Sequence, residues 1–315
     1  MTVEPPVIFD PTVPPSSAAA SSLTGTLVYV RDDGATIDLN DGAKIKLRHH
    51  DGFGIPEFQH AVSPSPGIDG DYWFGVRYPP RIVTVDVTLF ADGLAALQNL
   101  RREIITALNP TVFAGTLEMV QVNGTARRFD CVLAETLPMP TTQHIGQKAM
   151  MLTLRFRSVG EPFLYDPVPQ VYSVRSGTGN PGNFMVGGFS FPFRLSQSGV
   201  FNQVVMTYQG DVPTPVTLTL YGPGLEPVFR NDTLGRIVSF ERSGFELPKD
   251  GTLIVDMDPR HRSVTFQGGQ NGWPYLRESG FWWLQPGPNS LTFEVGGSTP
   301  DTLLTMTYFR RYLGV

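Results

Sequence analysis

The sequence is poor in cysteine and in basic charge. Cys131 is the single cysteine among 315 residues, so no intramolecular disulfide can form, and we expect its thiol to be buried as a small apolar group. Lys and Arg number 24 against 29 Asp and Glu, which gives a net charge of -5. A surface that coats nucleic acid needs clustered basic residues, so we expect no sequence-specific nucleic-acid binding.

Membrane and export signals are also missing. No stretch approaches the roughly 20 apolar residues that a helix needs to cross a bilayer. The first ten residues contain Glu4, Pro5 and Pro6 where an export signal would place basic residues before an apolar run. We therefore expect that the chain is synthesised in the cytoplasm and does not insert into a membrane.

Turn-forming residues are abundant instead. The chain has 33 Gly and 28 Pro with 41% hydrophobic residues, a composition typical of many turns between short strands. Residues 1–22 are rich in Pro, Ser and Ala without any periodicity, which predicts an extended N-terminal arm. Pro162–Pro169 interrupts every period, so we predict domains at 23–165 and 191–315 with a linker and entry segment at 166–190.

Periodic patterns predict a mixed first domain. Ile82–Leu89 alternates apolar and polar residues as a half-buried strand does. Residues 37–47 predict a hairpin that turns at Asn40–Gly42. Residues 92–109 carry leucine and isoleucine at helical spacing and predict one helix, capped by Asp92, lying on a sheet. Further strands are predicted at 115–121, 127–135 and 152–157.

The second domain is predicted to contain only strands. Residues 216–220, 253–257 and 291–295 alternate apolar and polar side chains, and glycine-rich turns separate them. Short strands at this spacing favour a sandwich or jelly roll. The chain as a whole is therefore predicted to be mostly β.

Motifs for chemistry are incomplete. Gly177, Gly179 and Gly182 fit the G-x-G-x-x-G spacing, but Pro181 lies inside it and no amphipathic helix follows, so we expect no nucleotide cofactor. Two further groups of residues are read as structural, namely the histidines His49, His50 and His60, which lack a full metal ligand set, and the turn aspartates Asp69, Asp71, Asp256 and Asp258. We predict no catalytic residue, no metal site and no enzymatic activity.

An aromatic stretch is the most distinctive local feature. Trp273 and Tyr275 are followed by Phe281–Trp283, and aromatic rings on β-sandwiches can stack against sugars. In a strand, Phe281 and Trp283 would face one way and Trp282 and Leu284 the other, so at least one pair is expected in the core. Trp273 and Tyr275 remain the candidates for glycan stacking.

Turns and strands follow one another in a definite order across both domains. In the second domain this order is carried by Gly210–Thr214, Gly222–Gly224, Asn231, Thr233, Gly235, Leu253, Val255, Asp256, Phe281, Trp282, Leu284, Pro286, Gly287, Asn289, Leu291, Phe293 and Tyr308–Tyr312. In the first domain it is carried by Gly52, Gly54, Pro56, Gly70, Asp71, Arg81–Leu89, Asp92–Asn109 and Arg127–Leu133. The order resembles that of the distal tail protein family of long-tailed, non-contractile phages (siphophages).

The resemblance implies a fold and a role. The fold would be a tail-tube-like β-sandwich or split barrel with one flanking helix, followed by a jelly-roll sandwich similar to galectins and carbohydrate modules. The role would be that of a homo-hexameric ring in the virion tail tip, with first domains around the channel through which DNA passes. Its implied partners are the tail tube protein and the tail-tip hub protein, with the tape measure protein as a further candidate.

The alternative is a sugar-binding sandwich that contacts the host surface as an adhesin. Some relatives carry inserted sugar-binding modules, and the spacings here leave no room for one. Robust glycan binding by the second domain that is lost on Trp273→Ala would favour this alternative. An enzyme ranks behind both hypotheses.

Deleting residues 2–22 is expected to weaken ring assembly while each domain stays folded, because an extended arm can reach across to a neighbouring subunit. Light scattering measures the mass of the assembly, and circular dichroism checks the fold. An unchanged mass after the deletion would sink this role for the arm.

Overall fold

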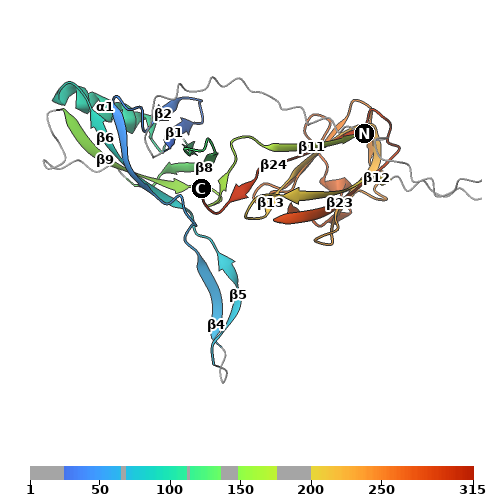
Figure 1. Ribbon diagram of the computed structural model, residues 1–315. Helices are drawn as coiled ribbons and strands as arrows, with labels where there is room; N and C mark the ends of the chain where they lie inside the picture. Colours follow the sequence, from blue (N-terminus) through green and yellow to red (C-terminus); the bar gives the residue numbers. More distant parts are fainter. Residues whose placement is uncertain (1–24, 65–68, 112–113, 136–147, 176–199) are drawn as a thin grey trace, which may run out of the picture.

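The computed structural model describes residues 25–64, 69–111, 114–135, 148–175 and 200–315 (Figure 1). The arm predicted at 1–22, the glycine motif at 177–182 and part of the linker predicted at 166–190 lie outside these residues. Figure 1 shows two β-rich bodies side by side, a hairpin that projects away from them, and the C-terminus between the bodies. No helix among the described residues is long and apolar enough to span a membrane.

The first body, which we call the first domain, is built on one large antiparallel sheet. Its main path runs β2-β1-β7-β8-β9-β6-β3. These strands are β1 (Thr26–Arg31), β2 (Thr36–Asp38), β3 (Ile45–Asp51), β6 (Ile82–Phe90), β7 (Gly115–Val120), β8 (Ala126–Leu133) and β9 (Ala149–Ser158). A helix, α1 (Leu94–Ala107), follows β6 directly, and β4 (Gln59–Pro64) pairs with β5 (Asp71–Arg77) as a separate hairpin.

Alternation along the central strands builds the core of the first domain. In β6, Val83, Val85, Val87 and Leu89 are at most 1% exposed, which confirms the strand predicted at 82–89. Helix α1 buries Leu97 and Ile104 against the same cluster. Cys131 is also fully buried there, as expected, and burial raises the pKa of its thiol.

The hairpin predicted at residues 37–47 is wrong. Strand β2 pairs with β1 and strand β3 pairs with β6, so the two lie at opposite edges of the sheet path. The loop between them is held by Asp41, whose carboxylate accepts hydrogen bonds from the backbone of Ala43, Lys44 and Ile45. The turn residues therefore connect the two edges of a curled, open sheet, as in a split barrel.

The predicted helix is present, but its predicted cap is wrong. Gly93, not Asp92, occupies the N-cap position, and no side chain caps the helix. Gly93 has φ 142°, a conformation that favours glycine and turns the chain sharply out of β6. The backbone of Leu97 then donates to the carbonyl of Gly93 and closes the first turn.

The second body, which we call the second domain, is a sandwich of two antiparallel sheets. One sheet has the order β11-β24-β14-β18-β19-β20, and the other β12-β23-β15-β16-β21, with β17 paired to β15. The first of these contains β11 (Gln170–Arg175), β14 (Thr217–Tyr221), β18 (Thr252–Asp256), β19 (Ser263–Phe266), β20 (Gln270–Asn271) and β24 (Leu303–Tyr308). The second contains β12 (Val200–Tyr208), β15 (Gly224–Asn231), β16 (Arg236–Ser239), β17 (Glu246–Leu247), β21 (Glu278–Ser279) and β23 (Gly287–Gly296).

The two sheets enclose a second core. Their inward residues are buried in the predicted alternation, among them Leu218, Val255 and Phe293. A small pair, β13 (Thr214–Pro215) with β22 (Trp283–Leu284), closes one end. Mostly β structure, one helix on the first sheet and a second-domain sandwich confirm the predicted fold class, whereas the boundaries set at 165 and 191 stay predictions.

Trp282→Ala should lower the free energy of unfolding of the second domain by about 3–5 kcal/mol, as expected for a large-to-small change in a core. Trp282 is fully buried, and its indole N–H donates to the carbonyl of Phe229 at 3.2 Å. The matched control is Trp273→Ala, because Trp273 is 41% exposed and its loss should cost about 0.5 kcal/mol. Urea unfolding followed by near-ultraviolet circular dichroism measures both; equal losses would contradict this assignment of the core.

Candidate functional site

Two strands cross between the domains side by side. The chain leaves the first domain through β10 (Leu164–Tyr165) into β11, and it returns from β24 into β25 (Arg311–Tyr312). Strand β10 pairs with β25, and β11 pairs with β24, so the two crossings form one antiparallel ribbon. Between these pairs the backbone of Asp166 donates to the carbonyl of Arg310 at 3.2 Å. Strand β10 lies inside the proline-rich joint, where the sequence predicted no regular structure.

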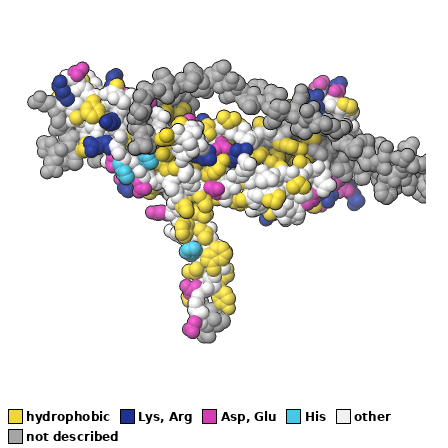
Figure 2. Space-filling view, in the orientation of Figure 1, with side chains coloured by type: hydrophobic (Ala, Val, Ile, Leu, Met, Phe, Trp, Pro, Cys, Tyr) yellow, Lys and Arg dark blue, Asp and Glu magenta, His cyan; other side chains and the backbone are white. Residues whose placement is uncertain are grey.

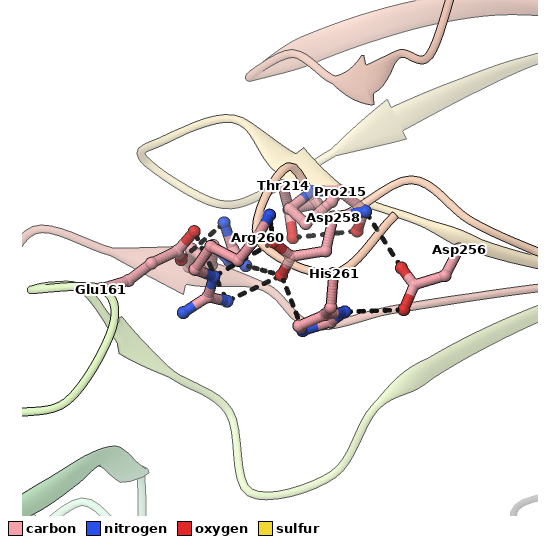
Figure 3. A network of polar contacts seen from close by, with 8 residues as sticks. Glu161, Thr214, Pro215, Asp256, Asp258, Arg260 and His261 are labelled. Carbon is pink, nitrogen blue, oxygen red and sulfur yellow. Dashed lines mark hydrogen bonds and ion pairs between the residues drawn. The ribbon is translucent and has the colours of Figure 1, made fainter. Parts of the chain in front are cut away.

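An ionic cluster holds the domains together beside this ribbon (Figure 3). Glu161 of the first domain accepts from Arg311 at 2.6 Å and lies 3.7 Å from Arg260 of the second domain. Arg260 forms a two-point pair with Asp258, at 3.1 Å from Nε and 2.7 Å from the terminal nitrogen. Because Asp258 and Arg311 are mostly buried, this cluster is less screened than a surface pair.

Asp258 is the anchor of the cluster. Burial by itself raises the pKa of its carboxyl, but hydrogen bonds from the Arg260 side chain and backbone outweigh that effect and bring the pKa to about 2. His261 lies on the outer side, with its Nδ1 2.9 Å from Asp256 and its Nε2 3.6 Å from Asp258. The carboxylate therefore stays charged at neutral pH.

A second polar contact secures the ribbon itself. Asp166 accepts from Arg127 at 2.5 Å and from the hydroxyl of Tyr312 at 3.2 Å. The guanidinium of Arg127 also lies over the Tyr312 ring, 3.6 Å from its centroid, which is cation–π distance. The hydroxyl of Tyr165, on β10, donates to the carboxylate of Asp130, on β8, at 2.5 Å. Burial first, and then this hydrogen bond, raise the pKa of Tyr165.

A pocket of about 280 Å³ opens at the junction. Its apolar walls come from the joint and from the end of β24, and its polar walls are the ionic cluster just described. The lining includes Phe163, Tyr308, Phe309, Asp130, Glu161 and Arg311. Because its charged groups already pair with one another, the pocket is a seam between domains in which ions are satisfied internally.

Arg81 closes the junction from the side of the first domain. It is 2% exposed, and its guanidinium donates to carbonyl oxygens at 2.5–2.8 Å. Burial lowers the pKa of Arg81 to about 10, so it keeps its charge at neutral pH. The acceptors belong to Gly52, Gly54, Pro162 and Leu313.

The β4–β5 hairpin exposes large apolar side chains on a two-stranded element. Figure 2 shows hydrophobic side chains along much of the projection. Trp73 is 64% exposed and Phe74, at a bulge in the pairing, is 72% exposed. Val62 and Tyr72 are exposed as well. A two-stranded hairpin is marginally stable alone, and contiguous apolar exposure marks an interaction surface.

The structure separates the two aromatic residues proposed for glycan stacking. The Trp273 ring contacts Phe281 with centroids 5.5 Å apart, at the surface. Tyr275 is partly buried, and its ring meets Phe245 and Phe266 edge-on at the margin of the core. The two rings contact different neighbours, and glycan stacking by them stays a prediction. Trp282 and Leu284 are fully buried, which confirms that one of the predicted pairs belongs to the core.

The remaining sequence candidates are dispersed. His49 pairs in register with Asp86 on the outer face, whereas the His50 ring meets Phe53 on the other side of β3. His60 lies on the hairpin and accepts from the Trp73 indole at 3.2 Å. Within the described ranges, no group of three or more His, Cys, Asp or Glu side chains is arranged to hold a metal ion.

The residues that build the junction were not found from the sequence, apart from Asp258. Asp258 was read as a turn former, and it does accept from the backbone of Arg260 in such a turn. Its ion pairs add a role that the turn pattern does not reveal. Arg81 and Arg311 lie in segments that carry the family resemblance, but no local pattern predicts their contacts or those of Glu161, because the partners are far away in the sequence.

Comparisons with known proteins match one stretch in each domain. Residues 33–136 match the family model of the phage tail protein RIFT-related domain. Residues 209–312 match the model of the siphovirus-type tail component, C-terminal domain. A search of curated proteins gave no significant match.

Solved structures share the fold. The chain is similar to the SPP1 Dit (gp 19.1) protein, described as a paradigm of the hub adsorption apparatus in phages that infect Gram-positive bacteria, with 15% identity and a TM-score of 0.61 over 90% of this chain and 98% of that one. It is also similar to a chain of the phage P2 baseplate in its activated conformation with Ca, with 12% identity and a TM-score of 0.51 over 93% and 100%. The corresponding Sr structure gives 13% identity and a TM-score of 0.51, again over 93% and 100%.

Acid should loosen the junction through Asp258. Since the pKa of about 2 in the folded chain lies below the ordinary aspartate value of 3.8, the ionised carboxylate stabilises the folded chain above pH 3.8, and this stabilisation is lost as the pH falls towards 2. Asp258→Asn should lower the unfolding temperature at neutral pH and flatten its fall between pH 4 and 2. Calorimetry across this range measures both effects.

The control for this prediction is Asp301→Asn, which removes the carboxylate of an exposed pair with Lys249. An exposed pair contributes little, so this variant should follow the wild type. If Asp258→Asn and the wild type lose stability in parallel below pH 4, Asp258 is not the anchor.

Proposed function

Because the chain belongs to the distal tail protein family of siphophages, we propose that it forms a hexameric ring that joins the tail tube to the tail-tip hub. Membership makes it a structural component of the phage tail and places it in the virion. The ring, its hexameric order and the identity of its neighbours are the proposal. The tail tube protein would bind on one side and the hub protein on the other, with the tape measure protein as a further candidate contact.

The observation that carries the ring is the exposed hairpin. Trp73 and Phe74 present large apolar surfaces on a two-stranded sheet, and no described residue adds a third strand or a core behind it. A monomer that leaves such rings in water loses the free energy that their burial would supply, about 25 cal/mol per Å² of apolar surface. A second copy of the chain that covers the hairpin would recover it.

Repetition of one such contact supports a closed ring. If the hairpin of each copy packs on a different surface of the next copy, the interface is head-to-tail. An assembly built with a fixed rotation between copies then either closes into a ring or extends as an open filament. A connector at the end of a tube has to close. The first domains would then line a channel through which DNA passes, and no base-reading contact is required of them.

The junction supports this function by fixing geometry. A ring needs every copy to present the hairpin and the second domain at the same angle. The paired crossings β10–β25 and β11–β24, with the partly buried contacts of Glu161 and Arg311 to Arg260 and Asp258, hold that angle within each copy. Adhesion to sugars is the weaker hypothesis, since Tyr275 packs against Phe245 at the margin of the core and only Trp273 of the two is exposed.

Trp73→Ser combined with Phe74→Ser should weaken association of the chains at least about tenfold, since central aromatic residues dominate interface energies. Sedimentation velocity over a concentration series measures it. Folding should be unaffected, because both side chains are mostly exposed in the single chain.

Trp273→Ser is the matched control, since it removes an exposed tryptophan from the second domain. It should leave association unchanged. A folded double variant that associates as the wild type does would overturn the hairpin as the ring interface.

A further inference from the structure

The two legs of the β4–β5 hairpin meet at one buried side chain. One leg leaves the first domain after Gly52 and the other returns just before Arg81. Gly52 has φ 98°, and a Cβ at this position would lie 2.2 Å from the carbonyl oxygen of Ile82, so the legs approach as closely as backbones can. The base of the hairpin is therefore a tightly packed point rather than a loose loop.

The donors of Arg81 reach three separate segments of the chain. One terminal nitrogen donates to the outgoing leg, at 2.5 Å to Gly52 and 2.8 Å to Gly54. Nε donates at 2.6 Å to Pro162 in the joint between the domains. The other terminal nitrogen donates at 2.6 Å to Leu313, beyond the returning strand β25. One guanidinium thus joins the hairpin base, the joint and the C-terminal segment.

These contacts are interdependent because the charge is buried without a carboxylate. All four acceptors are backbone carbonyls, and among the described residues no carboxylate pairs with Arg81, so the dipoles of these carbonyls stabilise the positive charge. Loss of one acceptor leaves a buried N–H without a partner, which is costly, and the guanidinium would shift to find another. The planar fork of arginine makes this multiple contact, and a lysine cannot reproduce it.

A second series of contacts runs the same way. The Trp73 indole donates to His60, and the His60 ring lies 5.2 Å from Phe58 at the hairpin base. Phe58 lies 6.5 Å from Tyr78 on the other leg, and Tyr78 lies 5.3 Å from Phe163 of the joint. Phe163 lines the junction pocket. The aromatic rings therefore also connect the hairpin to the seam between the domains.

The C-terminal segment completes the base of the hairpin. The backbone of Val315 donates to the carbonyl of Phe53 at 3.1 Å. Gly314 packs so closely on Gly54 that a Cβ there would lie 3.2 Å from its carbonyl carbon. This segment follows β25, which is present in the first sheet only because the second domain returns the chain to it.

We propose that Arg81 is a positioning residue that makes the orientation of the β4–β5 hairpin depend on the docking of the C-terminal segment, and through it on the second domain. Movement of the second domain would alter the Leu313 and Pro162 acceptors and reorient the hairpin. By linkage, a partner that fixes the hairpin also favours the docked second domain. This coupling between the hairpin and the second domain operates within a single chain, whether or not the chain forms a ring.

The test measures hairpin orientation directly. Spin labels are attached to Ala61→Cys on β4 and Glu103→Cys on α1, both exposed positions, while Cys131 is fully buried and stays unlabelled. Labelled chains are diluted in unlabelled chains, so that only distances within one chain contribute. Pulsed electron paramagnetic resonance then reports the distribution of the distance between hairpin and first domain.

Two variants perturb Arg81 from opposite sides. Arg81→Lys keeps the charge and loses the fork. Deletion of residues 313–315 keeps Arg81 and removes the docked C-terminal segment, which includes its Leu313 acceptor and the Val315–Phe53 hydrogen bond. Both should broaden the distance distribution relative to the unmodified chain. Arg155→Ala is the control, because its pair with Glu135 is exposed and belongs to the same domain, and it should leave the distribution narrow.

Folding is verified for each variant by thermal unfolding. If Arg81→Lys does not fold, the deletion decides the question, since it leaves every core residue in place. An unchanged, narrow distribution in a folded deletion variant would overturn the proposal. Equal broadening in Arg155→Ala would overturn it as well, because the effect would then not depend on Arg81.

Discussion

The antiparallel ribbon between the domains is the constraint on which the rest of the structure depends. A single linking strand could rotate about its own bonds, whereas two paired crossings resist rotation because their hydrogen bonds must break together. The ribbon brings Arg311 to Glu161 and Tyr312 to Asp166, and so it creates the places where charges are buried. Burial then makes the charges sensitive to position, since an unpaired ion in such a seam is strongly unfavourable.

The hairpin, unlike the junction, leaves its apolar side chains exposed. Each domain buries its own apolar residues in a closed cluster, but Trp73 and Phe74 lie outside both clusters. A tail component is functional only in an assembly, and a surface that is unfavourable in the free chain becomes favourable when a neighbour covers it. The rigid seam and the exposed hairpin therefore have complementary roles. The seam fixes the angle between the domains, and the hairpin contacts a neighbouring copy in the orientation that this angle sets.

Patterns in the local sequence predicted the features that depend on neighbouring residues, such as the burial of alternate side chains in a strand. The alternation in Ile82–Leu89 follows from period two, and the structure has it, whereas Phe281 and Trp282 are both buried because the chain is not extended as a strand before Trp283. Asn40–Gly42 has turn chemistry, yet the strands on either side pair elsewhere, because pairing is settled by the whole sheet. Asp92 was displaced as a cap by Gly93, whose positive φ the bend required. The hairpin was missed because its strands are exposed on both faces and show no alternation.

The junction could not be predicted because its partners are distant in the sequence. Nothing near Arg81 indicates that its acceptors are Pro162 and Leu313, and nothing near Glu161 points to Arg311. Resemblance to a family supplied the order of elements and the class of function, but it did not supply these contacts. Side-chain geometry was needed to find them.

Electron cryo-microscopy of the assembled chain shows directly whether copies with a fixed angle between their domains close into a ring through the hairpins. The account predicts a closed hexamer with a mass six times 34.6 kDa, in which each hairpin packs on the neighbouring copy and the ribbon between the domains is intact. A reconstruction with hairpins that extend freely into solvent, or with domains at variable angles in different copies, would contradict it.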